Sequence, residues 1–252
     1  MKDYYATYLE TLHGALKNIT LFEREKIDAA AAMMAEAIEL DELIHVFGTG
    51  GHSTMGAMEL FWRAGSLAPI NPLLEASLLP SNGALHSNYI ERTEGLAGSI
   101  LKSYEVKTGE VLIIVNAYGI NAMTIDAALE AKKMGLKTIC ITNKEFADKV
   151  PKGAPARHSS NKNLYELADI YIDNNLPYGD ACVSIEGMNQ KIAPSSTILN
   201  SFCLNLLVIG TVGRLLEKGI EPPVWMSANL PEGDTANKKW HKKYNERIKH
   251  LR

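Results

Sequence analysis

The stretch LIHVFGTGGHSTMGAMELFWRAG, residues 43–65, decides the fold class. A short apolar run ends in three glycines within four residues, a His-Ser-Thr sequence follows, and a helical pattern completes the stretch. A strand, a glycine loop and a helix in this order direct backbone N–H groups toward an anion at a helix N-terminus. We therefore expect an α/β protein with an anion-binding loop after its first strand.

Further apolar runs alternate with helical patterns along the chain. Buried strands are expected at residues 43–48, 68–76, 110–117, 137–142 and 168–174. Helices are expected within 2–40 and at 53–65, 88–103, 121–134, 162–168 and 196–218. This alternation predicts a three-layer αβα sandwich, in which a parallel sheet lies between two helix layers. We predict one domain over residues 1–252, with N-terminal helices at 1–40, the core at 41–218, and a C-terminal loop and basic helix at 219–252.

Composition argues against several classes of protein. The net charge of −3 gives no reason to expect nucleic acid. The basic residues 237–252 are expected to form a solvated or subunit-packing helix, with a nucleic-acid arm as the alternative. Cys140 and Cys203 are expected to be buried thiols, because Cys140 lies in a strand-like run and Cys203 in a helix-like run. No signal peptide is expected at the N-terminus. The apolar helix at 200–216 is shorter than the roughly 20 residues of a membrane span, so we expect a cytoplasmic protein without a membrane partner.

Three loops predict one shared site for an anion. Residues 48–54, 116–121 and 194–197 are rich in Gly, Ser, Thr and Asn, and each precedes a predicted helix. Ligands of open parallel sheets bind beyond the carboxyl ends of the strands, where the first two loops lie. Backbone N–H groups at helix N-termini bind anions without a net positive charge. We therefore expect these three loops to surround a common pocket.

Nucleotide and metal sites fit the pattern less well. Gly48 and Gly50 begin a dinucleotide fingerprint and Glu75 could close the second strand, but Ser53 stands where the third glycine belongs. A phosphate-binding P-loop needs a lysine, and His52 follows Gly51 instead. No HExxH or paired-cysteine motif occurs. We expect no cofactor and no metal.

Three motifs resemble those of the SIS (sugar isomerase) domain. They are Gly51-His52-Ser53 with Gly56, VLIIVNAYGINAMTIDAALEAKKMGLKTICIT at 111–142, and APSSTILNSF at 193–202. The chain is most similar to phosphoheptose-isomerase-like bacterial SIS proteins, in stretches that include ELFWRAG at 59–65 and ARHSSNKNLYELADIYIDN at 156–174. The resemblance implies a five-stranded parallel sheet, sugar-phosphate ligands, and homo-oligomers with pockets at subunit interfaces.

The second motif departs from the family pattern. The family has serines in this loop, and those serines hold the phosphate, whereas this loop reads Asn116-Ala117-Tyr118-Gly119-Ile120-Asn121. Asn116 and Tyr118 can donate hydrogen bonds, but Tyr118 fills space that a phosphate needs. The anion is therefore a phosphate bound differently, a smaller or sulfonate-type group, or absent.

The residues expected to bind the sugar and its anion lie in these motifs and in the C-terminal loop. They are Gly51, Ser53, Thr54, Asn116, Tyr118, Gly119, Asn121, Ser195, Ser196, Thr197 and Asn229. Asn229 stands where arabinose 5-phosphate isomerases have a His-Pro-Gly-Gly stretch. Because an amide cannot transfer protons at neutral pH, Asn229 is expected only to position substrate.

Two glutamates are candidates for the proton transfer that sugar isomerisation requires. Glu91 is expected to begin a helix, and by spacing it resembles a catalytic glutamate of N-acetylmuramic acid 6-phosphate etherases; the alternative is a helix-dipole partner paired with Arg92. Glu59 lies two turns into the helix after the glycine loop and either faces the pocket or pairs with Arg63 at i,i+4. The resemblance implies a glutamate at position 63, so Arg63 argues against the zinc of the heptose isomerases.

Three histidines are candidates for ring opening, because their pKa lies near neutrality. They are His52, His86 and His158, each in a loop near a predicted strand end. His45 alternates within the first strand and is expected to be a hydrogen-bonded core group. His13, His241 and His250 are expected at the surface of terminal helices.

The sequence predicts an aldose–ketose isomerase that acts on a sugar phosphate or a similarly anionic sugar. A carboxylate would move a proton between adjacent carbons through an enediol, and hydrogen-bond donors would hold the oxyanion. The alternatives are an amino-sugar phosphate lyase or deaminase, and a non-catalytic sugar-phosphate-binding protein.

Overall fold

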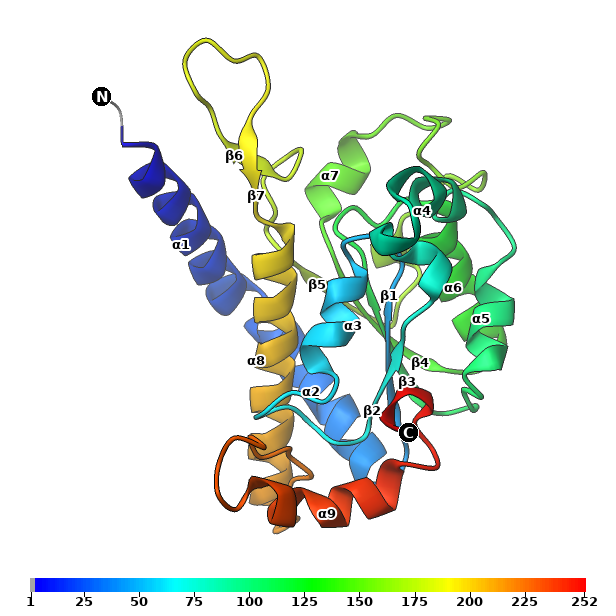
Figure 1. Cartoon of the computed structure of the whole chain (residues 1–252). Coiled ribbons are helices and arrows are strands. Elements are labelled where there is room, and N and C mark those ends of the chain that lie inside the picture. Colours follow the sequence, from blue (N-terminus) through cyan, green and yellow to red (C-terminus); the bar gives the residue numbers. More distant parts are fainter. Residues whose placement is uncertain (1–2) are drawn as a thin grey trace.

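Five parallel strands form the central sheet of the computed structural model, which describes residues 3–252 (Figure 1). The strand order is β2-β1-β3-β4-β5. The strands are β1 (Ile44–Gly48), β2 (Ile70–Leu73), β3 (Val111–Val115), β4 (Lys137–Thr142) and β5 (Ile170–Asp173). Each strand falls inside one of the five predicted runs, so the predicted α/β fold with a five-stranded parallel sheet is confirmed.

Helices cover both faces of this sheet (Figure 1). The helices are α1 (Tyr4–Phe22), α2 (Arg24–Glu39), α3 (Thr54–Leu60), α4 (Ala84–Ile90), α5 (Ala97–Ser103), α6 (Ala122–Lys133), α7 (Lys144–Lys149), α8 (Ser196–Glu217) and α9 (Gly233–Tyr244). The described part of the chain also contains the short 3-10 helices η1 (Ala76–Leu78), η2 (Pro80–Asn82), η3 (Leu164–Glu166) and η4 (Lys249–Leu251).

Alternate residues of the strands bury their side chains in opposite helix layers. Ile113 belongs to the core cluster that includes residues of α1, α2, α3 and α8, whereas its neighbours Leu112 and Ile114 belong to the cluster that includes residues of α5 and α6. Strands buried on both faces require nearly continuous apolar runs, which is why the sequence identified them. In register, Gly48 lies beside Val115, and Val115 beside Ile141, so the loops that follow these strands meet at one edge.

Several elements differ from the expectations. The helix expected at 88–103 is two helices, because residues 91–95 form turns and Gly95 adopts a φ of 88°. The segment at 162–168 contains only the 3-10 helix η3. An antiparallel hairpin of β6 (Ala181–Val183) and β7 (Ile192–Pro194) precedes α8 and was not predicted. The single-domain organisation stays a prediction.

Helix α8 is the only element of residues 3–252 with the length and apolar composition of a membrane span. It packs against α1, α2 and α3, and its Asn200 and Thr211 are buried inside the chain. Its 22 residues reach the length of a membrane span, so the expectation that this apolar helix is too short was wrong, and 44% of its apolar stretch is buried inside the chain. Cytoplasmic location stays a prediction.

His45 lies in the core at β1 and is hydrogen-bonded, as expected. Its Nε2 lies 2.7 Å from Oε2 of Glu110, and its Nδ1 lies 3.1 Å from Nδ2 of Asn71. Burial opposes the charge of Glu110, but the contacts to His45 and to backbone N–H groups outweigh it and lower the pKa of that carboxyl. Cys140 and Cys203 are buried free thiols. His13 is exposed, as expected, and His241 and His250 are partly exposed and pack against aromatic rings.

Candidate functional site

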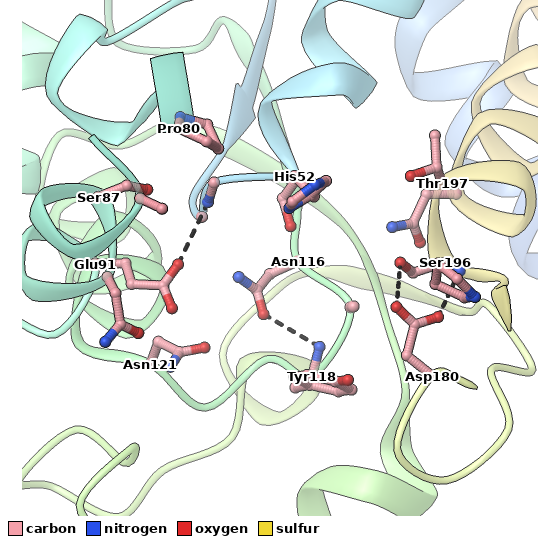
Figure 2. A pocket seen from close by; sticks show the side chains of 18 residues that line it. His52, Pro80, Ser87, Glu91, Asn116, Tyr118, Asn121, Asp180, Ser196 and Thr197 are labelled. Carbon is pink, nitrogen blue, oxygen red and sulfur yellow. Dashed lines mark hydrogen bonds between the residues drawn. The ribbon is translucent and has the colours of Figure 1, made fainter. Parts of the chain in front are cut away.

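A cavity of about 400 Å³ lies at the carboxyl edge of the sheet (Figure 2). It is formed by the loops after β1 and β3, by α4, and by the N-terminus of α8. Its lining residues are Gly50, Gly51, His52, Ser53, Pro80, Ala84, Ser87, Asn88, Glu91, Asn116, Ala117, Tyr118, Asn121, Asp180, Pro194, Ser196, Thr197 and Asn200. The three loops predicted to surround a common pocket therefore do meet.

The glycine loop turns too tightly for side chains. A Cβ atom at Gly48 would lie 2.0 Å from the carbonyl oxygen of Ser53, and one at Gly50 would lie 2.8 Å from Oε2 of Glu91. The hydroxyl of Thr54 donates to the carbonyl of Gly51 over 2.6 Å and closes the turn. These glycines allow the loop to approach the Glu91 side chain directly.

Glu91 presents a carboxylate to the cavity (Figure 2). It caps the C-terminus of α4, so the expectation that it begins a helix was wrong. Its carbonyl accepts the N–H of Met123 over 3.0 Å, and its Oε2 accepts the N–H of Gly51 over 3.3 Å. Burial raises the pKa of Glu91, although the Gly51 hydrogen bond and nearby Arg92 and His52 oppose the shift. A carboxyl group with a raised pKa suits proton transfer near neutral pH.

In the second-motif turn, the side-chain oxygen of Asn116 binds the backbone N–H groups that an anion would otherwise bind. Oδ1 of Asn116 accepts the N–H of Tyr118 over 3.1 Å and that of Gly119 over 2.9 Å. Gly119 adopts a φ of 63°, and its carbonyl accepts the N–H of Leu164. These two turn N–H groups are therefore occupied by a protein oxygen. The two N–H groups on Nδ2 of Asn116 remain available to the cavity as donors.

Tyr118 forms part of the cavity wall. Its ring stacks on Phe146 with centroids 3.9 Å apart, and Phe146 stacks in turn on Tyr178 at 5.0 Å. Burial, with a contribution from the charge of Asp180, raises the pKa of Tyr118 to about 12. The hydroxyl is therefore protonated at neutral pH and can donate a hydrogen bond.

The N-terminus of α8 holds the carboxylate of Asp180. Oδ1 of Asp180 accepts the N–H groups of Ser195 over 2.8 Å and Ser196 over 2.7 Å. Oδ2 accepts the hydroxyl of Ser196 over 2.8 Å (Figure 2). Gly179 and Asp180 both adopt positive φ, at 87° and 70°, which turns the carboxylate under the helix. The anion at this predicted anion site is thus part of the protein.

Nine of the predicted site residues line the cavity. They are Gly51, His52, Ser53, Glu91, Asn116, Tyr118, Asn121, Ser196 and Thr197. Three others, Thr54, Gly119 and Ser195, support the turns behind it.

The remaining predicted site residues lie outside the cavity lining. Nε of Arg63 lies 3.3 Å from Oε1 of Glu59, which also accepts Nδ2 of Asn205, as the i,i+4 alternative for Glu59 proposed. His158 is buried, with Nε2 3.1 Å from Asp126, and its N–H binds the carbonyl of Ile120. His158 thereby supports the second-motif turn from behind.

Two further predicted site residues, His86 and Asn229, also lie outside the cavity lining. His86 belongs to α4 rather than to a loop and is exposed. Asn229 is exposed and lines a separate hollow of about 200 Å³ beside Trp62 and Trp225. Neither contributes to the cavity lining.

Sequence reasoning missed Asp180, Ser87, Asn88 and Asn200. The Gly-Asp pair at 179–180 is a turn signal that could have indicated an exposed carboxylate, but nothing in it indicated α8 as the partner. The titratable lining groups in the described chain are His52, Glu91, Tyr118 and Asp180, and no group of three His, Cys, Asp or Glu there is arranged to hold a metal ion. The donor set therefore does not fit a zinc site.

The family follows from comparison with known proteins. A family model described as SIS domain matches residues 7–143. The chain belongs to the SIS domain family. It is 41% identical over 247 residues to UPF0309 protein TTE0306 of Caldanaerobacter subterraneus subsp. tengcongensis, covering 97% of this chain and 98% of that protein. It is 40% identical over 248 residues to UPF0309 protein Teth39_1980 of Thermoanaerobacter pseudethanolicus, with the same coverage of 97% and 98%.

Solved structures share the fold of this SIS protein at low sequence identity. A phosphoheptose isomerase from Francisella tularensis is 16% identical, with a TM-score of 0.55, over 84% of this chain and 100% of that chain. A phosphoheptose isomerase from Neisseria gonorrhoeae is 16% identical, with a TM-score of 0.50, over 82% and 94% of the two chains. At these identities the likeness concerns the fold.

Proposed function

We propose that this chain is an aldose–ketose isomerase that acts on a sugar phosphate or a similarly anionic sugar. The observation that carries the proposal is the Glu91 carboxylate, which lies in the cavity beside the glycine loop and has a raised pKa. Membership of the SIS domain family and a fold shared with phosphoheptose isomerases support the choice of sugar chemistry.

Glu91 is the proton carrier of the proposed reaction. The ionised carboxylate removes the proton from the carbon next to the carbonyl. The electron pair of the C–H bond forms the C=C bond, and the π pair of the carbonyl moves to its oxygen, which gives the enediolate. Glu91 then returns the proton to the former carbonyl carbon. The hydroxyl proton moves between the two oxygens, so the product is an isomer of the substrate and no atom is gained or lost.

Neutral donors stabilise the enediolate in this proposal. Nδ2 of Asn116 and the protonated hydroxyl of Tyr118 belong to residues that line the same cavity as Glu91. Donors held in place before the reaction stabilise developing charge without reorganisation. His52 is exposed at the glycine loop, where it can assist ring opening.

Hydrogen exchange in heavy water tests the proposal. A panel of aldose and ketose phosphates is incubated with the protein, and deuterium at the carbon beside the carbonyl is followed by NMR. We expect exchange and isomerisation of at least one sugar, and neither with Glu91→Gln. Binding without exchange would instead identify a non-catalytic sugar-binding protein, and release of ammonia from an amino sugar would identify a deaminase.

A further inference from the structure

The two ends of the cavity differ in what they offer to a ligand. Figure 2 shows Glu91 on one side and Asp180 with Ser196 on the other, with Asn116 and Tyr118 between them. Among the lining residues that the structure describes, two are carboxylates and none is lysine or arginine. A phosphate at either end therefore meets a negative charge, and Arg92, the cation near Glu91, lies outside the cavity lining.

The donors at the α8 end are already bound to an anion. Asp180 accepts the N–H groups of Ser195 and Ser196 and the hydroxyl of Ser196, with all three distances between 2.7 and 2.8 Å. These are the groups that an external phosphate would need at this helix N-terminus. Because Asp180 belongs to the same chain, a free phosphate must compete with a carboxylate that is always present at the site.

The Asp180 carboxylate retains one unused acceptor position. Oδ1 accepts two backbone N–H groups, whereas among residues 3–252 Oδ2 accepts only the Ser196 hydroxyl within 3.0 Å. A carboxylate oxygen has two lone-pair directions, so Oδ2 can accept one further donor from a ligand in the cavity. The donors that a sugar provides are hydroxyl groups and, in amino sugars, an ammonium group.

We propose that Asp180 is a specificity-determining residue, which excludes phosphate from the α8 end of the cavity and accepts a hydrogen bond from a hydroxyl or ammonium group of the sugar. The inference rests on the proposed function for the identity of the ligand as a sugar. A phosphorylated substrate accordingly binds with its phosphate away from Asp180. The α8 end of the cavity binds the uncharged or cationic part of the substrate.

Titration with inorganic phosphate tests the exclusion, with the backbone amide NMR signals of Ser195 and Ser196 as local readout. We expect these signals to stay in place in the wild type and to shift saturably in Asp180→Asn, with phosphate affinity at least about tenfold higher, because a carboxylate within hydrogen-bond range of a phosphate repels it strongly. Ser196→Ala removes one donor but keeps the carboxylate, so its Ser195 signal should stay in place. Saturable shifts in the wild type, or none in Asp180→Asn, would overturn the proposal.

Asp169→Asn is the matched control. Asp169 also accepts a backbone N–H and a hydroxyl, both from Thr138 at 2.7 Å, but it lies outside the cavity lining. For the sugar that shows exchange, Asp180→Asn should lower kcat/KM by about 10- to 100-fold, the loss expected for a hydrogen bond to a charged group, while Asp169→Asn leaves it unchanged. Equal kcat/KM in the wild type and Asp180→Asn would refute the acceptor role.

The two proposals fail separately. If no sugar exchanges, the isomerase proposal fails, and the phosphate titration still decides whether Asp180 excludes phosphate. If Asp180→Asn leaves phosphate excluded while Glu91→Gln abolishes exchange, the isomerase proposal stands and the role of Asp180 falls.

Discussion

The proposed chemical role of Glu91 comes with a cost of burying its carboxylate. A proton-abstracting base must be ionised, so kcat/KM should rise with pH through the pKa of Glu91, which burial raises above 4.5. We expect Glu91→Gln to lower kcat by about 100- to 10,000-fold with ligand affinity nearly unchanged, because glutamine keeps the shape and loses the basicity. Steady-state kinetics and calorimetric titration measure the two quantities. Full activity of the variant would remove Glu91 from the mechanism.

Glu94→Gln provides the control for this variant. Glu94 lies three residues away, outside the cavity lining, and binds Ser159. Its replacement should leave kcat unchanged.

The raised pKa of Glu91 also means that the folded state binds the proton more tightly than the unfolded state, so the stability that the Glu91 carboxyl contributes is lost as pH rises through that pKa. Thermal unfolding at neutral pH should therefore show Glu91→Gln to be at least as stable as the wild type.

Tyr118 tests whether the second-motif loop has been reshaped for a particular substrate. Its ring lines the cavity and stacks on Phe146, which supports a role as a wall. We expect Tyr118→Ser to lower kcat/KM for the natural substrate and to admit larger phosphorylated sugars. Tyr118→Phe keeps the stacked ring and is the matched control, which should not admit them. Equal affinities of wild type and Tyr118→Ser for every ligand would place Tyr118 outside the binding site.

At the scale of elements, the turn between β3 and α6 depends on Gly119. Its φ of 63° is unfavourable for other residues, and a Cβ there would lie 2.4 Å from Oγ1 of Thr142. Gly153 has a φ of 76° with no atom within 4 Å of an added Cβ, so it separates backbone strain from steric clash. We expect Gly153→Ala to cost about 1–2 kcal/mol in the free energy of unfolding and Gly119→Ala clearly more. Urea denaturation measures both; equal costs would contradict the clash.

Strands β1, β3 and β4 could be predicted from the sequence because they are buried on both faces and form apolar runs, whereas β5, at the edge of the sheet, is only partly buried. The break between α4 and α5 could not, because residues 88–103 retain a helical pattern through the turn at 91–95, and this break is what moves Glu91 from a helix start to a helix end. The β6–β7 hairpin consists of strands of three residues, too short to show a period.

The candidate site was predicted in part for a similar reason. Loops that directly follow strands are placed by the sheet, and His52, Asn116 and Ser196 line the cavity as expected. Asp180 follows no core strand directly. Two successive residues with positive φ bring its carboxylate beneath a helix that begins 16 residues later, and no local pattern encodes that contact.

At the scale of the whole molecule, apolar surface remains on α1 and α8. The apolar residues Ala30, Ala31 and Met34 of α2 are not part of this surface, because they are buried within the chain. The exposed groups are instead Leu9 on α1, 67% exposed, and Ile209 and Leu216 on α8, 67% and 60% exposed. Ile209 and Leu216 share one face of α8, because seven residues make about two turns.

We therefore predict a homodimer or larger assembly in which α8 contributes to the interface. Ile209→Lys should shift the molar mass measured by light scattering toward that of the monomer, because a charge would be buried without a partner. Tyr89→Lys, at a 65% exposed position on α4, should leave the assembly unchanged. A wild-type monomer at low concentration with intact ligand binding would contradict the prediction.

Gly48 limits how this protein can be re-engineered. A side chain there would meet the carbonyl oxygen of Ser53 at 2.0 Å and Cα of Thr54 at 2.5 Å, and these backbone atoms cannot rotate away as a flexible side chain can. A directed-evolution library aimed at new substrates should hold this codon constant and randomise those of His52 and Tyr118. In a natural relative with another residue at this position, we expect the glycine loop to have a different backbone path rather than the same loop with a new substrate specificity.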